Sequence, residues 1–558
     1  MSKQSNLRAI EFLEKEKQFH LGFLPTEQSS PLTRKLDREF AKSTADGVRN
    51  LQSVDRNVLA MARRVFPSEQ FQKLVDSGWR TILDGGKIVF SGCGATGRLS
   101  ILLECMWRDC CAKTPAAAKY ADQVFSIMTG GDYALVKSVE FFEDYQAFGR
   151  RQVQEMGLGA KDMLVAITEG GETSSVLGTV FEALERGVQA FLMFNNPADL
   201  LAEHLERSRK AIRDPRVCVL DLSCGPMALA GSTRMQATTS EQLVAGGALE
   251  TVMNRLLGLQ TFDYAAEFDQ LLNELATPSS VQAMADYIDF ESKIYRDKGL
   301  VTYFANDFLL DIFTDTTERS PTFMLPPFRK NDDALSPRPW AFVKNPLLNT
   351  SVTWTEAMHR PLRCLDWNSK DYLEMEAPAS VQDNLPKIQA SELLKFEVGK
   401  ESVQDRVATG HDAAILVTVG KSQTNPDVFQ AFDTISTPFA WRRHLSVGGG
   451  DGDFAVSCNL PDTPLQTMRH LAVKLVLNTI STGVMAVLGR ITGNWMSWVD
   501  VSNKKLIDRA ARLIAEIGNL DYRTACLKLF EAIEVLEKNS QSEEKMSVVQ
   551  YVLKQLGR

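Results

Sequence analysis

The sequence predicts an α/β protein with two parallel sheets in tandem, and three observations carry this prediction. Short apolar runs rich in Val, Ile and Phe alternate with helical stretches through the first half of the chain, and the same rhythm restarts in the second half. The runs are almost continuously apolar, which fits strands that are buried on both faces. A helical tail follows from about residue 503.

The elements are expected in the following order. Residues 5–80 have a mostly helical pattern, and the segment around 265–295 joins the two halves. Strands of the first half are expected at 87–92, 123–131, 162–171, 190–197 and 217–223. Strands of the second half are expected at 299–307, 413–420 and 453–460, with a proline-rich irregular stretch at 320–340.

Composition narrows the class of protein. The chain has 558 residues, which suggests three or four domains, and a net charge of −8, which argues against a non-specific nucleic-acid surface. No signal-peptide core and no uncharged apolar run of 18 residues is visible, so we expect no membrane span. Nine scattered cysteines without a Cys-x-x-Cys pair indicate reduced thiols in a cytoplasm, and the six unclustered histidines make a metal site unlikely.

A glycine-rich loop follows the first expected strand. Its residues 92–97 have the spacing Gly-x-Gly-x-x-Gly and lead into a helical segment, an arrangement that favours an anion at the helix start. An NAD site also needs an acidic residue about 20 positions further on, whereas Asp132 comes 35 residues after Gly97. NAD, another phosphate and a purely structural turn all remain open, and we favour the phosphate.

Two further loops could contribute to one site. Residues 168–175, Thr-Glu-Gly-Gly-Glu-Thr-Ser-Ser, lie between the third strand and a helix. Helix N-caps explain one or two of these hydroxyls but less well four hydroxyls and two glycines. Residues 231–234, Gly-Ser-Thr-Arg, could place further donors at another helix start, although for this stretch alone an N-cap followed by a solvated arginine is the favoured explanation.

Five ordered motifs resemble one protein family. They are "SGCGATGRL" (91–99), "SVEFFEDYQAFG" (138–149), "ITEGGETSSVLG" (167–178), "GSTRM" (231–235) and "KLVLNTISTGVMAVLGRITGNWM" (474–496). The match is to sugar isomerase (SIS) domain proteins, in the branch of the N-acetylmuramic acid 6-phosphate etherases and the glucokinase regulatory proteins. Five motifs in the family's order are far more specific than one glycine loop.

The spacing of these motifs separates the two members of the branch. The etherases have one SIS domain, and their last two motifs nearly adjoin, whereas here about 240 residues separate them. The chain therefore resembles the glucokinase regulatory proteins, which have two SIS domains (flavodoxin-like parallel sheets flanked by helices) and a C-terminal helical lid. We expect an N-terminal helical segment at 1–60, SIS domains at 61–275 and 276–500, and the lid at 501–558.

The resemblance implies a sugar-phosphate site. Two loops of the first domain should line the phosphate, through residues Gly94, Thr96, Gly97, Thr168, Gly170 and Thr173. Thr233 and Arg234 match a ligand-proximal pair, Lys474 matches a lysine that reaches the phosphate from the far domain, and Glu318 in "TTERSPTF" matches a glutamate that reaches the sugar. Two carboxylates in the second loop, Glu169 and Glu172, depart from the family pattern.

Catalysis depends on two carboxylates in the etherases. One matches Glu143, which would act as an acid or base near the transferred proton. The other lies eight residues after the arginine of the glycine loop, and the ungapped position here is Met106. Glu104 lies two residues before Met106, so on a helix its side chain would point about 200° away from that of Met106. Without the motif, Glu140 and Glu143 would be assigned to a solvated helix face.

These residues lead to two functional hypotheses. The first is a cytoplasmic regulator without a cofactor that binds a phosphorylated hexose or amino sugar, such as fructose 6-phosphate, between its domains. The resemblance implies a sugar kinase as its partner. The alternative is an etherase-like lyase that eliminates lactate and uses Glu143. Sugar-phosphate isomerisation is a more distant third.

Overall fold

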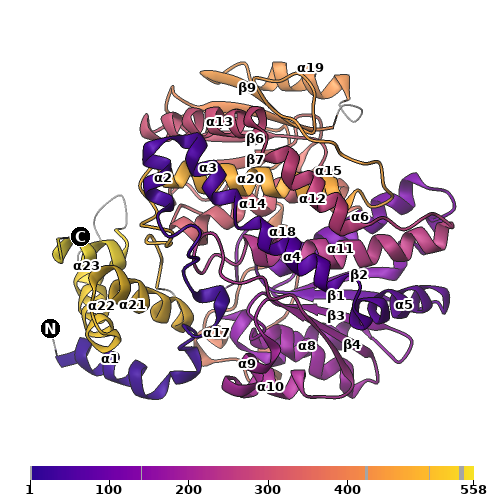
Figure 1. Ribbon diagram of the computed structural model, residues 1–558, viewed down its shortest axis with the longest axis horizontal. Helices are drawn as coiled ribbons and strands as arrows, with labels where there is room; N and C mark the ends of the chain where they lie inside the picture. The colour runs from indigo at the N-terminus through magenta and orange to yellow at the C-terminus, as the bar shows by residue number, and fades with distance from the viewer. Residues whose placement is uncertain (1–2, 140, 421–424, 502, 539–545, 558) are drawn as a thin grey trace.

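Two five-stranded parallel sheets form the framework of the computed structural model, which describes residues 3–139, 141–420, 425–501, 503–538 and 546–557 (Figure 1). The first sheet has the order β2-β1-β3-β4-β5. Its strands are β1 (Ile88–Gly92), β2 (Val124–Met128), β3 (Met163–Ile167), β4 (Gln189–Phe194) and β5 (Val217–Asp221). The predicted α/β fold of two parallel sheets flanked by helices is confirmed.

The second sheet has the order β10-β9-β8-β6-β7. Its strands are β6 (Val301–Phe304), β7 (Ala341–Lys344), β8 (Ala413–Val419), β9 (Trp441–Val447) and β10 (Phe454–Val456). The sequence did not indicate β7, which follows directly on the proline-rich stretch, or β9. The first four residues of β9 lie outside the core, so this strand lacks the apolar run that marks the others.

Burial on both faces explains the continuous apolar runs of the first sheet. All five residues of β3 are buried, and neighbours such as Leu164 and Val165 belong to different core clusters on opposite faces. Helix α8 (Ser174–Glu185) packs on the face that Leu164 occupies. Helices α5 (Glu69–Leu83), α6 (Ala95–Lys113) and α11 (Gln236–Leu257) supply residues to the core on the other face.

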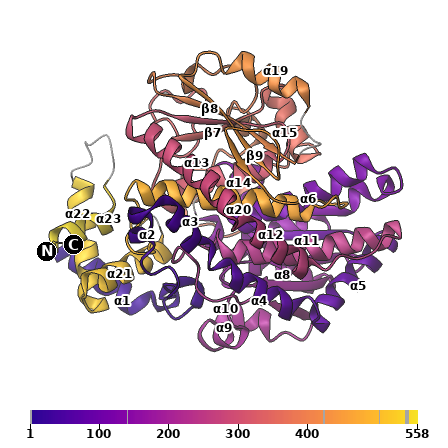
Figure 2. The same cartoon turned by 45° about the horizontal axis from the view of Figure 1, so that its top comes forward.

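Two helices lie between the sheets. Helix α14 (Leu309–Phe323) and helix α20 (Thr467–Val487) run through the middle of the molecule in both views (Figures 1 and 2). Among the described residues, α20 is the one helix that is long and apolar enough to cross a membrane, but 89% of that apolar window is buried inside the protein. Its hydrophobicity is therefore that of a core helix.

The two ends of the chain pack together. Helices α21 (Lys504–Gly518), α22 (Tyr522–Lys538) and α23 (Val548–Gln555) form a separate core cluster with α1 (Lys3–Lys15), which contributes Ala9 and Phe12. Helices α2 (Leu36–Lys42), α3 (Thr44–Gln52) and α4 (Asp55–Val65) join the main core instead. Leu21 and Leu24 join the core on the α8 face of the first sheet, so the expected N-terminal segment 1–60 contributes to three separate cores.

Candidate functional site

Two helix starts meet at the carboxyl edge of the first sheet. Strands β1 and β3 are hydrogen-bonded neighbours, and each leads through a short loop into a helix, α6 after β1 and α8 after β3. The first amides of a helix have no acceptor within it, and the helix dipole is positive at this end. Two such starts at one sheet edge form a site suited to an anion.

The glycine loop after β1 has tight backbone geometry. Gly94 has φ +57°, a conformation that side chains rarely adopt, and a Cβ on Gly92 would lie 2.3 Å from the backbone of Thr96. The buried Thr96 hydroxyl donates to the Cys93 carbonyl (2.9 Å) and accepts from the Cys93 amide (3.0 Å). The hydroxyl therefore closes the loop, and the backbone amides remain the donors available for a ligand.

The loop after β3 is held by similar local bonds. The Thr168 hydroxyl donates to the Thr173 hydroxyl (3.0 Å), and the Gly171 amide donates to the Thr168 carbonyl (3.0 Å). The Asn196 side chain donates to the Gly170 carbonyl (3.0 Å). These bonds fix the loop that leads into α8, so the predicted residues of this loop form a single compact turn.

The two carboxylates of this loop lie in different environments. Glu172 forms ion pairs with Arg207 (3.0 Å) and Lys505 (3.1 Å). Burial alone would raise the Glu172 pKa, but these two cations lower it to about 2. Burial raises the pKa of Glu169 to about 7, and the nearby charges of Glu318 and Glu172 add to that rise. The charge of Glu172 is therefore offset by two cations, whereas the Glu169 carboxyl is partly neutral at pH 7.

Lys505 is a site residue that sequence reasoning missed. It lies at the start of α21 and brings a positive charge from the C-terminal helices to the β3 loop. Burial opposes its charge, but Glu172, Glu27 and Glu143 raise its pKa above the ordinary value. The five motifs end at residue 496, so the available signal was the pair Lys504 and Lys505 near the start of the helical tail.

Glu143 lies near the glycine loop. The Asn503 side chain donates to its carboxylate (3.3 Å). Burial raises the pKa of the Cys93 thiol, and the charge of Glu143 is the next largest cause. Its neighbour Glu140 lies outside the described residues. The structure thus brings Glu143 to the same edge of the first sheet as the two loops.

Glu104 lies in a different environment. It is fully buried, accepts from Arg108 (2.9 Å) and Ser126 (2.7 Å), and is also paired with Arg363 and Arg360. Met106 is buried in the core of α6. Glu104 is therefore part of an arginine cluster, and no carboxylate occupies the position expected for the second etherase glutamate.

Asp132 is also engaged elsewhere. Its carboxylate accepts two bonds from the Arg360 guanidinium, at 2.7 and 2.8 Å. Arg360 comes from the second half of the chain, after α15 (Thr350–Met358). Asp132, the acidic residue after β2, thus links the two halves of the chain. This role agrees with the sequence argument against an NAD ribose contact at Asp132.

The turn 231–235 leads into α11. Thr233 is half-buried, whereas Arg234 is buried and donates to Asp315 of α14 (3.0 Å) and to Thr482 of α20 (3.1 Å). The ammonium group of Lys474 on α20 contacts the carbonyls of Arg234 (3.0 Å) and Met235 (3.2 Å). The structure therefore brings Arg234 and Lys474 together, as the motifs predict.

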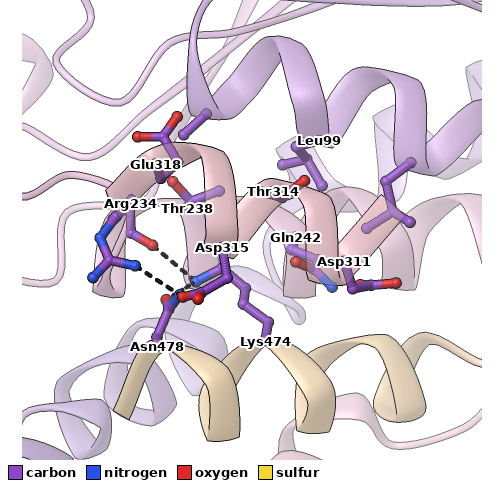
Figure 3. Close-up of a pocket in the computed structure, with 12 residues that line it drawn as sticks. Leu99, Arg234, Thr238, Gln242, Asp311, Thr314, Asp315, Glu318, Lys474 and Asn478 are labelled. Atoms are coloured by element: carbon purple, nitrogen blue, oxygen red, sulfur yellow. Dashed lines mark hydrogen bonds and ion pairs between the residues drawn. The ribbon is translucent and has the colours of Figure 1, made fainter. Parts of the chain in front are cut away.

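A small enclosed cavity lies between four helices at this point (Figure 3). Its volume is about 20 Å³, which holds roughly one water molecule. It is lined from α6, α11, α14 and α20 by Ala95, Leu99, Leu102, Arg234, Thr238, Gln242, Asp311, Thr314, Asp315, Glu318, Lys474 and Asn478. Glu318 accepts from Arg98, which follows the glycine loop. Three predicted residues thus share this cavity, and Ala95 joins it to the glycine loop.

Comparisons with known proteins agree with the motifs. A family model described as "Glucokinase regulatory protein N-terminal SIS domain" matches residues 70–184. Proteins named N-acetylmuramic acid 6-phosphate etherase are similar to 40% of this chain: 28% identity in Bacillus licheniformis, 32% in Erwinia tasmaniensis and 31% in Yersinia pestis. These alignments span 67%, 66% and 68% of the respective relatives, about two thirds of their length.

Solved structures of other proteins also align with this chain. Tagatose-6-phosphate ketose/aldose isomerase from Escherichia coli aligns with a TM-score of 0.43 and 8% identity, covering 82% of this chain and 96% of that one. The C-terminal domain of glucosamine-fructose-6-phosphate aminotransferase from Francisella tularensis aligns with a TM-score of 0.43 and 10% identity, covering 80% and 97%.

Proposed function

This chain belongs to the SIS-domain family, in the branch of the N-acetylmuramic acid 6-phosphate etherases and the glucokinase regulatory proteins, and on that premise we propose that it binds a phosphorylated sugar beside the first sheet. The observation that carries the proposal is the convergence of two glycine- and hydroxyl-rich loops, each opening a helix, at the ends of β1 and β3. Anions are favoured where free helix amides and positive helix ends converge.

The proposed pocket has a phosphate end and a sugar end. Backbone amides of the two loops, at Gly94, Thr96, Gly97, Gly170 and Thr173, would surround the phosphate. Thr168 would shape the second loop, because its amide already donates to the Met193 carbonyl (3.0 Å) and its hydroxyl to Thr173. Lys505 would supply positive charge from α21, about 3.1 Å from the Glu172 carboxylate that it now pairs with. The sugar would extend towards Thr233 and towards Glu318, which lines the cavity between the helices.

A panel of ligands tests the binding proposal. The melting temperature of the protein is measured with fructose 6-phosphate, fructose 1-phosphate, N-acetylmuramic acid 6-phosphate and NAD. A ligand that binds only the folded protein at 100 times its Kd stabilises it by about 2.7 kcal/mol. We expect at least one sugar phosphate to raise the melting temperature and NAD to leave it unchanged. A shift with NAD and none with any sugar phosphate would contradict the proposal.

The first finer hypothesis is a regulator that binds without catalysis, with a sugar kinase as the partner implied by the family and a cytoplasmic location. Its support is the arginine cluster around Glu104 and the core position of Met106, which leave Glu143 without the second expected carboxylate. The match of residues 70–184 to the regulatory-protein model also favours this hypothesis.

The second finer hypothesis is an etherase-like lyase, and the named relatives favour it over the regulator because they carry that name at 28–32% identity. Glu143 beside the glycine loop would then move the proton during elimination of lactate. Incubation with N-acetylmuramic acid 6-phosphate decides between the hypotheses. Lactate release that is lost in Glu143→Gln would support the lyase, and binding without lactate release would support the regulator.

A further inference from the structure

The turn 231–235 depends on partners from outside its own helix. Gly231 has φ +76°, and Met235, the residue before α11, has neither helical nor extended backbone angles. The Met235 side chain makes no capping hydrogen bond at the start of α11, where the Ala237 amide donates to the Met227 sulfur (3.2 Å). The Ser232 hydroxyl is buried, and within the described structure it has no hydrogen-bond partner. Local backbone bonds hold part of the turn, such as that from the Met235 amide to the Ser232 carbonyl (3.1 Å), and contacts from other elements add to them.

Lys474 of α20 supplies the first set of contacts. Its ammonium group lies 3.0 Å from the Arg234 carbonyl and 3.2 Å from the Met235 carbonyl. It also lies 2.7 Å from the Thr239 hydroxyl and 2.9 Å from the Asn478 side-chain oxygen. An ammonium group has three protons, so these four acceptors already use its full donor capacity.

Arg234 supplies the second set. Its guanidinium donates to Asp315 of α14 (3.0 Å) and to Ser481 (3.3 Å) and Thr482 (3.1 Å) of α20. Asp315 is itself fixed, because Arg319 lies 2.9 Å from its other oxygen. The Arg234 side chain therefore extends into the helices of the second half, and Figure 3 shows it converging with Asp315, Lys474 and Asn478.

We propose that Lys474 and Arg234 are positioning residues, which pin the turn 231–235 to α14 and α20 so that Ser232 and Thr233 are presented to the phosphorylated ligand. The sequence motifs suggested instead that Lys474 reaches the phosphate and that Arg234 lies close to the ligand. This inference rests on the proposed sugar-phosphate function. The positive charge at the phosphate would then come from Lys505 and from the N-termini of α6 and α8. Helices α14 and α20 of the second half would shape a binding site that lies in the first half.

The surroundings of Lys474 make this support dependent on pH. The charged groups that act on it are Asp55 on α4, Arg234 in the turn before α11, Glu241 on α11 and Asp315 on α14. Burial lowers the Lys474 pKa to about 7, although Asp55 opposes this effect. Above that pH the neutral amine keeps only two protons for four acceptors. The turn is therefore held best below about pH 7 and less well as the pH rises.

Two substitutions separate positioning from direct contact. Lys474→Met removes the ammonium group, and Thr239→Val removes one of its acceptors at a residue that does not line the cavity. Titration calorimetry with fructose 6-phosphate and N-acetylmuramic acid 6-phosphate measures the affinity. We expect at least a tenfold loss in Lys474→Met, a loss of several-fold in Thr239→Val, and no change in the control Lys370→Met, whose side chain is 82% exposed. Full affinity in Thr239→Val with a large loss in Lys474→Met would indicate direct contact and overturn the proposal.

The pH profile gives a second readout that a merely structural lysine would not change. Affinity is measured between pH 6 and 9 in a Glu169→Gln background, because Glu169 also titrates near pH 7. We expect the affinity to fall above pH 7 with Lys474 and to stay level with Lys474→Arg, which remains charged. A fall that persists unchanged in Lys474→Arg would overturn the proposal.

Amide hydrogen exchange separates this inference from the proposed function. Exchange of residues 232–238 is measured without any ligand, in the wild type and in Thr239→Val. Faster exchange in the variant supports the positioning role even where no sugar phosphate binds, in which case only the proposed function fails. Unchanged exchange in the variant, at either side of pH 7, would overturn the positioning role.

Discussion

Individual residues of the candidate site have roles that their type alone does not reveal. Thr96 was predicted as a phosphate ligand, and its hydroxyl closes the glycine loop through two bonds to Cys93. The motifs identified Lys474, but a sequence cannot show that its ammonium group meets two backbone carbonyls of another helix start. Lys505 was missed because its position depends on how α21 packs. Motifs therefore locate residues, whereas their bonding partners require the tertiary structure.

Glu27 is a buried carboxylate that ties the N-terminal segment to α21. It pairs with Arg509 (2.7 Å) and Arg512 (2.8 Å), and these cations overcome the effect of burial and lower its pKa to about 2. Because the folded pKa lies below the ordinary value of 4.5, this stabilisation is present above about pH 4.5 and is lost as the pH falls towards 2.

We predict that Glu27→Gln destabilises the packing of α21. Arg509 would remain buried without its anion, and Arg512 would keep only its pair with Asp508 (2.8 Å), at a cost of about 3–5 kcal/mol. Hydrogen exchange of residues 504–518 at pH 7 measures the free energy of local opening. The control Glu11→Gln removes an exposed pair with Lys15 and should cost under about 1 kcal/mol. Equal opening free energies for Glu27→Gln and the wild type would show that the buried pairs do not hold α21.

At the scale of elements, apolar patterning predicted most of the framework. All five strands of the first sheet coincide with the expected runs, apart from β4, which begins one residue earlier at Gln189. Strands buried on both faces leave a continuous apolar signal. Strand β9 left no such signal, since its first four residues are outside the core. The positions where helices cross could also not be predicted, because the sequence does not distinguish a glycine at a helix–helix contact from any other glycine.

Gly149 lies where α7 (Gln146–Met156) crosses α8. A Cβ on Gly149 would lie 1.8 Å from the Ser175 carbonyl oxygen, so the two backbones touch at this point. Alanine normally favours a helix over glycine by about 1 kcal/mol. Here the clash with rigid backbone outweighs that gain, and α8 starts at the proposed phosphate loop.

We therefore predict that Gly149→Ala lowers the melting temperature and weakens sugar-phosphate binding together, because α8 must shift. Differential scanning calorimetry and titration with fructose 6-phosphate measure the two effects. The matched control is Gly159→Ala, since nothing lies within 4 Å of a Cβ at that position. A melting temperature that rises in Gly149→Ala would mean that the helices separate without cost.

At the scale of the whole molecule, the two chain ends and the site form a connected unit. Helix α1 packs with α21 to α23, and α21 carries Lys505 to the β3 loop. Sequence patterning predicted helices at both ends but not their association, because contacts between residues some 500 positions apart leave no local pattern. The domain limits expected from the sequence remain predictions, and α1 shows why such limits are hard to read from one chain.

Phe12 tests this connection. Its side chain is buried against the C-terminal helices, and its ring lies 6.0 Å from that of Phe530. Replacing a buried phenylalanine by alanine costs about 3–5 kcal/mol through lost burial and the remaining cavity. We predict that Phe12→Ala loosens α21 and α22, whereas Phe429→Ala, at a position 37% exposed on α19 (Pro426–Ile435), does not.

The consequence should reach the site, because a looser α21 holds Lys505 less firmly near Glu172. Hydrogen exchange should accelerate over residues 504–538 in Phe12→Ala, while exchange in β1 and β3 stays at the wild-type rate. Affinity for a sugar phosphate should fall several-fold, and the loss should shrink in a Lys505→Met background because the charge is already absent. Additive losses in the double variant would mean that Phe12 and Lys505 act independently, and the chain ends would then support the fold without affecting the site.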